Sequence, residues 1–397
     1  MKKITSVIFA SVLSAGLLCT GAGAEQVIDS ADLGMHKIGV VVYNLNDEQV
    51  IAFRDYLENY IELCFPDVDF LYSSSVNNME QEMQFIQDAS DAGVEGILSF
   101  NSYDLEAEVK LCEENGIYYM RASSGVSDED YAKVAENPYF IGAIGPDTEM
   151  EYQAGYDMGK YFAENQEKGA YFICSGGAGF GVGSHRERVK GMIDGLQDGY
   201  GVTVSDNTAE LAAVPVSTTA EADGLKICVT PGFLDSENFL PAVVEAYEQD
   251  TYPVVLSAYP LSDFAAAAEK SIVGVIDCYS ETNLQLFTSG RLHYVSGKFS
   301  SSIGPSFVSM YNAVTGYAEA FREDGRAFRI SQDFWTSDSL QDYVDKYTLS
   351  SSVVLNAYSA EDLMAACKQI TPECGFADLK DLAEASSFED AFARRFQ

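Results

Sequence analysis

The stretch Ile38-Gly-Val-Val-Val42 begins the pattern that decides the fold of this chain. It is a short run of mainly β-branched residues, which is typical of a parallel strand buried on both faces. Apolar residues then recur at three- and four-residue steps from Val50 to Cys64, which predicts a helix that ends before Pro66. Another strand is expected at Phe70-Leu-Tyr72. A strand, a helix and a strand in this order, joined by short loops, predict a parallel sheet covered by helices.

The same alternation continues along the chain in two series. The first series has five predicted strands, which lie at 38–42, 70–72, 96–100, 117–120 and 139–144. The second series begins after Gly145-Pro146, and its predicted strands lie at 170–174, 227–230, 254–256 and 273–276. Helices are expected in this second series at 152–164, 184–196, 239–248 and 262–270. We therefore predict an α/β protein with two doubly wound lobes.

Two parts of the sequence are less regular than the rest. Residues 201–225 are small, polar and poorly periodic, so they predict no particular element. At the carboxyl end, a strand is expected at 352–358, and helices are expected at 360–369 and 376–396. Ser359 is a suitable N-cap for the first of these helices, because its hydroxyl can accept a backbone N–H of the first turn.

The first 24 residues have the features of an export signal. Two lysines precede an apolar run over 4–18, and the small residues Ala22-Gly-Ala24 come directly before Glu25. The apolar run is shorter than the roughly 20 residues of a membrane-spanning helix. We predict cleavage after Ala24. The alternative is lipidation of Cys19, which would tether the mature protein to a membrane.

Composition limits the classes of partner. The net charge of −37 argues against nucleic acid and anionic membrane surfaces, because both attract cationic proteins. The content of 47% hydrophobic residues, with 12% aromatics, excludes a disordered acidic tail. A chain of 397 residues is longer than one core usually supports, which again favours two lobes. We expect a monomer that self-repulsion keeps dispersed.

Cysteine and histidine patterns predict no metal centre. Seven cysteines follow Cys19 and none of them forms a C-x-x-C motif. We interpret them as buried thiols, although a disulfide between Cys367 and Cys374, the only close pair, is an alternative. The three histidines are widely scattered, which argues against a histidine-based metal site. No cofactor and no metal are therefore predicted.

Motifs for catalysis or nucleotide binding are missing from the sequence. The glycine-rich run from Ser175 to Gly183 lies between a predicted strand and a predicted helix, where a phosphate-binding loop would lie. Its spacing does not fit, because Gly177 and Gly179 are not followed by a glycine at 182. No G-x-S-x-G or H-E-x-x-H motif occurs, and we predict no catalytic residues. The chain has 61 acidic residues, so their number alone does not exclude the paired carboxylates of a glycoside hydrolase.

Three strings resemble the type I periplasmic solute-binding proteins of the ribose- and galactose-binding class. They lie at 38–47, at 152–161 and at 183–191, and the last contains the S-x-R-E-R-x-x-G pattern common in that family. The resemblance covers about 36–334 and implies two lobes joined by three chain crossings, near 145–147, 297–300 and 327–331. It implies a first lobe of 36–145 with 299–327, and a second lobe of 146–298 with a carboxyl-terminal extension over 328–397.

The resemblance also implies a ligand site. Arg186 matches the sugar-binding arginine of the family, although an ion pair with Glu187 is an alternative role for it. Asp277 matches an acid that binds sugar hydroxyls, and Lys298 stands where ribose-type proteins have a glutamine. The complete expected ligand-binding set is Arg186, Asp277, Lys298, Tyr259, Tyr43, Asn46, Asp47, Ser123 and Ser124.

Several positions depart from the family pattern. Gln49 and Val50 replace the aromatic residues that stack on sugars, Ser123-Ser124 replace an Asp-Arg pair, and Tyr259 replaces an asparagine. Two cationic candidates against one acid favour an anionic or strongly polar solute, such as a sugar acid.

These observations imply an exported solute-binding protein that does no bond chemistry. It would capture a sugar or a related polar solute between its lobes and deliver it to an ABC permease. One alternative is a receptor of the same fold that signals to a membrane kinase or a chemoreceptor. Another is an extracellular hydrolase. The export signal, and the lack of a basic headpiece before Ile38, argue against a cytoplasmic repressor of this fold.

Overall fold

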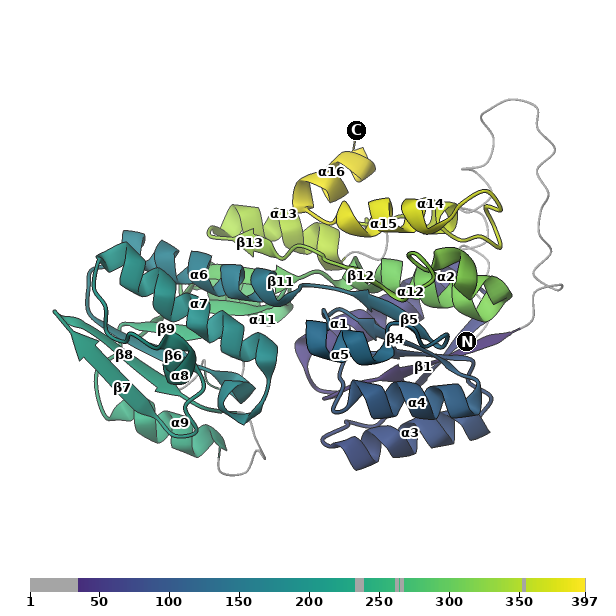
Figure 1. The fold of residues 1–397 in the computed structure, drawn as a ribbon. Coiled ribbons are helices and arrows are strands. Elements are labelled where there is room, and N and C mark those ends of the chain that lie inside the picture. Colours follow the sequence, from purple (N-terminus) through teal and green to yellow (C-terminus); the bar gives the residue numbers. More distant parts are fainter. Residues whose placement is uncertain (1–34, 233–238, 261–263, 265–267, 352–354, 397) are drawn as a thin grey trace, which may run out of the picture. The chain divides into compact units, whose positions relative to one another are not determined.

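The computed structural model describes residues 35–232, 239–260, 264, 268–351 and 355–396 (Figure 1). The predicted signal over 1–24, with Cys19, lies outside the described residues, as does most of the helix predicted at 262–270. Within the described ranges, none of the helices has the length and apolar character needed to cross a membrane.

The first sheet has six parallel strands in the order β12-β5-β4-β3-β1-β2. The strands are His36–Val41 (β1), Val68–Tyr72 (β2), Gly96–Ser99 (β3), Tyr118–Ala122 (β4), Phe140–Ile144 (β5) and Phe328–Ile330 (β12). All five strands predicted between 38 and 144 are present. Every residue of β3 and β5 is buried, which explains their continuous apolar runs.

Helices cover both faces of the first sheet. Buried residues of Met79–Asp91 (α3), Leu105–Asn115 (α4) and Asp128–Val134 (α5) pack together with one set of strand side chains. The other set packs against Glu48–Tyr56 (α1) and Gly304–Asn312 (α12). After α1 the helix continues through a π-helical turn at Leu57–Ile61 (η2) to Glu62–Cys64 (α2), so the helix predicted from 50 to 64 is present and contains a π-helical segment.

The second sheet has seven strands in the order β13-β11-β10-β9-β6-β8-β7. They are Ala170–Cys174 (β6), Thr218–Ala222 (β7), Leu225–Thr230 (β8), Val254–Ser257 (β9), Ile272–Cys278 (β10), Leu292–Lys298 (β11) and Trp335–Ser337 (β13). The five central strands are parallel, and the two edge strands, β7 and β13, are antiparallel to their neighbours. The sequence pattern predicts β6, β8, β9 and β10, but not β7, β11 or β13.

Thr148–Asn165 (α6) and Gly183–Tyr200 (α7) cover one face of this sheet and pack closely on each other. A Cβ at Gly155 would lie 1.9 Å from the Arg188 carbonyl oxygen, and one at Gly191 would lie 2.1 Å from the Tyr152 oxygen. Only glycine allows these helix backbones to approach so closely. Buried residues of Phe239–Glu248 (α9) and Glu281–Thr288 (α11) cover the other face. Short helices at Gly176–Phe180 (η3) and Thr208–Ala212 (α8) lie in loops, the second within the segment for which no element was predicted.

The chain passes between the two sheets three times, close to the three expected positions. The passages lie after β5, after β11 and after β12. Phe328–Ile330 pairs in parallel with β5, so residues 328–330 belong to the first sheet. The expected boundary between the two parts, at 327, therefore lies three residues too early. This pairing buries Phe328 and Ile330.

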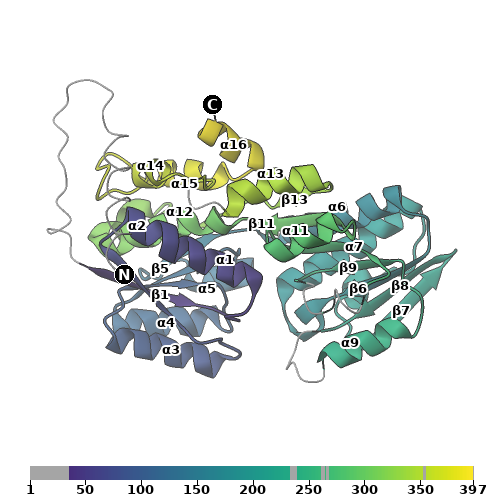
Figure 2. The same ribbon diagram turned by 180° about the vertical axis from the view of Figure 1, so that it is seen from behind.

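The carboxyl-terminal segment contacts elements of both parts. Leu340–Ser351 (α13) packs on α11 and β13. Ala360–Ala365 (α14) and Phe376–Glu384 (α15) pack on α12, beside which both views show them (Figures 1 and 2). The expected capping of α14 by Ser359 is confirmed, because its side chain accepts the Asp362 N–H and Asp362 accepts the Ser359 N–H.

Two predictions for this segment are wrong. Residues 355–358 form no strand, and 352–354 lie outside the described residues. The helix predicted over 376–396 is broken into α15 and Phe388–Phe396 (α16). The break occurs because Ser386 is buried and anchored, with its carbonyl accepting the Trp335 indole N–H (2.9 Å).

Candidate functional site

The predicted ligand-binding residues lie where the parallel strands end. In a parallel sheet the loops that follow the strands meet at one edge, which is where ligands usually bind. In the first sheet, the loop after β1 contains Tyr43, Asn46 and Asp47, and the loop after β4 contains Ser123 and Ser124. In the second sheet, Tyr259 follows β9, and Asp277 and Lys298 lie at the carboxyl ends of β10 and β11. Arg186 is in the first turn of α7. The residues thus come from the same kind of position in both sheets.

Asp277 is the most buried acid of this set. Only 7% of its surface is exposed, and its Oδ2 accepts a hydrogen bond from Asn283 Nδ2 (2.8 Å). Its Oδ1 has no hydrogen-bond partner among the described residues. Burial, followed by the charges of Asp47 and Glu48, raises the pKa of Asp277 to about 7. The side chain therefore has an oxygen that a donor from a solute could satisfy.

Asp47, another residue of the candidate site, has a structural role. It is the N-cap of α1, where its side chain accepts the N–H groups of Gln49 and Val50. The Tyr43 hydroxyl donates to the same carboxylate (3.1 Å). Burial raises the pKa of Asp47, and burial together with the Asp47 charge raises that of Tyr43. Asn46 is exposed, and its N–H donates to the side chain of Asn44.

Lys298 connects the end of β11 with the loop after β4. Its Nζ donates to the Ser123 carbonyl oxygen at 2.6 Å. Burial lowers the pKa of Lys298 to about 8, with Arg188 and Arg121 lowering it further and the Glu151 charge opposing them. The lysine is thus a hydrogen-bond donor of reduced pKa, held between the two sheets by contacts with the protein itself.

Ser123 has a strained backbone at this contact. Its φ is 62°, in the left-handed region that side chains other than glycine rarely adopt, and its hydroxyl is buried without a partner among the described residues. The hydroxyl of the adjacent Ser124 donates to the Gly125 carbonyl oxygen (3.3 Å). Of the two serines, Ser123 is therefore the one with an unsatisfied polar group.

The two arginines of the S-x-R-E-R string lie in different environments. The side chain of Arg186 is 50% exposed, and its Nε lies 3.3 Å from Glu187 Oε1, so the alternative ion pair is present. Arg188 is buried, with its Nε 2.5 Å from Glu151 Oε2 and Nη1 donating to the Ala258 carbonyl oxygen (2.8 Å). Arg188 and Glu151 are not in the ligand-binding set expected from the sequence, although Arg188 lies in the string 183–191 and Glu151 directly precedes the string 152–161.

Tyr259 stacks on a histidine that also closes the glycine-rich loop. The rings of Tyr259 and His185 lie 6.2 Å apart at an angle of 25°. Gly177 N donates to His185 Nδ1 (3.2 Å), so this loop N–H is used within the protein. Burial lowers the pKa of His185, and the charges of Arg188 and Lys298 lower it further, so the ring is neutral.

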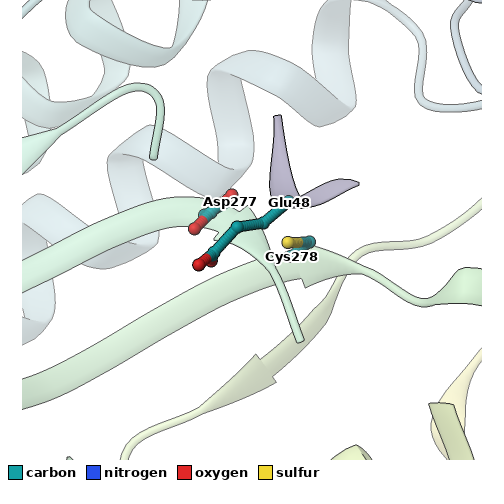
Figure 3. A group of neighbouring side chains, drawn as sticks. All are labelled: Glu48, Asp277 and Cys278. Carbon is teal, nitrogen blue, oxygen red and sulfur yellow. The ribbon is translucent and has the colours of Figure 1, made fainter. Parts of the chain in front are cut away.

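A group of potential metal ligands lies at the end of β10 (Figure 3). One ligand atom each of Glu48, Asp277 and Cys278 lies within 4.8 Å of the others. All seven cysteines from Cys64 to Cys374 are free thiols, and six of them are buried, which confirms the thiol interpretation over a Cys367–Cys374 disulfide.

Comparison with known proteins identifies the fold. No protein-family model matches the sequence, and no curated protein matches it. Among solved structures, an ABC transporter solute-binding protein from Bacillus halodurans with bound myo-inositol has a TM-score of 0.55 and 17% identity, over 80% of this chain and 100% of that one. A periplasmic solute-binding protein of an ABC transporter from Actinobacillus succinogenes with bound D-allose has a TM-score of 0.56 and 15% identity, over 77% and 99%.

A third structure, from Mycobacterium smegmatis in complex with β-D-fucofuranose, has a TM-score of 0.56 and 13% identity, over 78% of this chain and 93% of that one. This chain has the type I solute-binding protein fold. The predicted α/β class with two doubly wound parts is thereby confirmed. The solute-binding proteins are matched over nearly their whole length, whereas about a fifth of this chain has no counterpart in them.

Proposed function

We propose that this chain is an exported solute-binding protein that captures a sugar or a related polar solute and delivers it to an ABC permease. One observation supports this most strongly. Polar side chains from the strand ends of both sheets include two with a buried oxygen that has no partner in the described part of the chain, Asp277 and Ser123. An unsatisfied buried polar group costs about 1–3 kcal/mol, and a bound hydroxyl would remove that cost.

The residue types suit a hydroxyl-rich solute. A carboxylate accepts from hydroxyls, a lysine and an arginine donate, and tyrosine rings can pack on the C–H face of a sugar. The proposed ligand-binding set is the one expected from the sequence: Arg186, Asp277, Lys298, Tyr259, Tyr43, Asn46, Asp47, Ser123 and Ser124. The similar structures with bound myo-inositol, D-allose and β-D-fucofuranose support the same class of ligand. We propose no catalytic step.

Export follows from residues 1–24, which we propose to be removed after Ala24, with lipidation at Cys19 as the alternative. The mature protein would then meet its solute outside the cytoplasm and present it to the permease as a monomer. Deletion of the gene should abolish growth on the solute if the role is transport. Unchanged growth together with a lost response to the solute would favour the sensory receptor.

A thermal-shift screen of residues 25–397 tests the binding function. Mono- and oligosaccharides, sugar acids, polyols and nucleosides are compared, and a solute that binds only the native state raises the unfolding midpoint. The absence of a shift with all of these solutes would contradict the proposal.

A matched pair of arginine variants tests the predicted site. Arg186→Ala should abolish the shift with the best solute. Arg54→Ala should preserve it, because Arg54 has a similarly exposed side chain and likewise pairs with a neighbouring glutamate, Glu58. If Arg186→Ala binds normally while Lys298→Gln does not, the site includes Lys298 but excludes Arg186.

A further inference from the structure

Glu48, Asp277 and Cys278 approach one another from two distant parts of the sequence. Glu48 is the first residue of α1, beside the first sheet, and Asp277 and Cys278 end β10 of the second sheet. Their nearest oxygen and sulfur atoms lie within 4.8 Å of one another, and Figure 3 shows the two carboxyl groups turned toward the same space. In a tetrahedral zinc site, ligand atoms at bond lengths of 2.0–2.3 Å lie about 3.5 Å apart. A shift of about 1 Å would therefore complete the geometry.

Each carboxylate already has one oxygen held by a donor from the start of α11. Thr282 Oγ1 donates to Glu48 Oε1, and Asn283 Nδ2 donates to Asp277 Oδ2 at 2.8 Å. Outer hydrogen bonds of this kind orient the carboxylates of metal sites and leave the second oxygen to the ion. Two adjacent residues of one helix thus fix both carboxylates.

The second oxygen of Asp277 gives an independent indication of a missing ligand. Asp277 is 93% buried, since 7% of its surface is exposed, and Oδ1 has no hydrogen-bond partner among the described residues. The adjacent Cys278 thiol is close enough to the Asp277 carboxyl to favour its ionised form. Its distance and angle to Oδ1 do not, however, meet the criteria for a hydrogen bond. The other nearby charges that act most strongly on this carboxyl, those of Asp47 and Glu48, are negative. A cation would relieve both the repulsion and the missing contact.

We propose that Glu48, Asp277 and Cys278 bind a divalent cation of the zinc class, with a fourth coordination position open to water. The sulfur decides the class of ion, because calcium and magnesium take oxygen ligands, whereas zinc accepts a thiolate beside carboxylates. The ion binds the thiolate form of Cys278, so binding displaces the thiol proton to solvent. Three protein ligands and one open position are the arrangement in which zinc binds an exchangeable oxygen. If the proposed solute-binding function holds, a solute hydroxyl is the natural occupant of that position.

Cobalt substitution tests the site without reference to any solute. Residues 25–397 are stripped with a chelator and titrated with Co²⁺, with the expectation of one ion per chain and a thiolate-to-cobalt charge-transfer band. Zn²⁺ should displace Co²⁺ and raise the unfolding midpoint of the protein. Mg²⁺ and Ca²⁺ should do neither, and an equal response to them would contradict a site that includes Cys278.

Two pairs of variants locate the ion. Cys278→Ser should abolish the charge-transfer band, whereas Cys228→Ser, at another buried thiol of the same sheet, should retain it. Glu48→Gln should lower the affinity for Co²⁺ at least tenfold. Glu149→Gln, at the corresponding first turn of α6, should leave this affinity unchanged. Because Glu48 is only half-buried, its variant remains informative if the cysteine variant fails to fold. If the wild type takes up neither Co²⁺ nor Zn²⁺ in a saturable way, the proposed metal site is wrong. That result would not affect the proposed solute-binding function.

Discussion

Each sheet has a buried acidic group beyond the carboxyl end of one strand, and the two groups differ in how fully the protein satisfies them. Beyond β3, Glu82 of α3 and Glu108 of α4 are both fully buried. Glu108 accepts hydrogen bonds from four donors, namely the N–H groups of Tyr103 and Asp104 (both 2.8 Å) and the hydroxyls of Ser102 and Tyr119 (both 2.7 Å). Glu82 accepts from Tyr103 N (3.1 Å).

Asp277, at the end of β10, has only Asn283 for one oxygen and no partner for the other. Buried polar groups are normally paired, because an unpaired one destabilises the fold. The acids beyond β3 therefore fit a structural role, in which they hold the loop over 99–104. The acid of β10 fits a site that another molecule or ion completes. All three acids are buried, so the two groups differ in the number of hydrogen-bond donors that the protein supplies to them.

Glu108→Leu should have the largest effect on stability. It removes the acceptor of four donors at once, and each buried polar group left unsatisfied costs about 1–3 kcal/mol. We expect the free energy of unfolding to fall by about 3 kcal/mol or more, measured by urea denaturation. Glu106→Leu, at an exposed position of the same helix, should change it by less than about 0.5 kcal/mol. If Glu108→Leu lowers the free energy of unfolding no more than Glu106→Leu does, the hydrogen bonds of Glu108 do not stabilise the fold. The proposed difference between the acids beyond β3 and Asp277 would then be wrong.

Stability should decrease with rising pH because of Glu82. Burial, followed by the charge of Glu108 and a hydrogen bond with it, raises the pKa of Glu82 to about 9, while Arg121 opposes the shift. Native Glu82 is then protonated at neutral pH, whereas in the unfolded chain it ionises near its ordinary value of 4.5. The stabilisation is complete below that value and is lost as pH rises toward 9, by at most about 1.4 kcal/mol per pH unit.

Urea denaturation between pH 6 and 8 measures this slope. Glu82→Gln, which keeps the shape and removes the titration, should make the dependence less steep; any slope left in the variant belongs to other groups with shifted pKa values, such as Asp277 and Lys298. Equal slopes in the wild type and in Glu82→Gln would show that Glu82 is ionised in the native protein.

Asp277→Asn should behave in the opposite way to Glu108→Leu. It removes a charge that faces Asp47 and Glu48, so the free energy of unfolding should not fall. Affinity for the best solute of the screen should fall at least about tenfold, since a hydrogen bond to a charged group contributes about 1.5–3 kcal/mol. Calorimetric titration and urea denaturation of the same sample measure the two quantities. A variant that loses stability and binds normally would make Asp277 a structural acid like Glu108.

The sequence predicts the strands of this protein where burial leaves a strong pattern. Strands buried on both faces, such as β3 and β5, are mainly apolar, and the sequence predicts both. The edge strand β7 has the sequence Thr-Thr-Ala-Glu-Ala and is half-exposed, so no apolar run marks it. β11 contains His293, Ser296 and Lys298, which interrupt its apolar pattern.

For the candidate site, the strand pattern itself places a residue only where that residue ends a predicted strand. Asp277 follows the apolar run 273–276, which places it at the ligand edge of the sheet. Which of two arginines on α7 is buried depends on helix rotation and on Glu151 of another helix, and neither can be derived from spacing. The approach of Glu48 to Cys278 joins segments about 230 residues apart, so only the tertiary fold reveals it.

Ser123→Gly should have the smallest effect, and its sign is informative. The φ of 62° is strained for serine and not for glycine, and the hydroxyl that is lost makes no hydrogen bond within the described chain. The Lys298 contact is to the backbone oxygen and survives the change. We expect the free energy of unfolding to rise by about 0.5–1 kcal/mol. Ser124→Gly, at a residue without positive φ, should lower it instead. If Ser123→Gly destabilises the protein, its hydroxyl has a structural partner, and Ser123 belongs with the satisfied acids beyond β3 and not with Asp277.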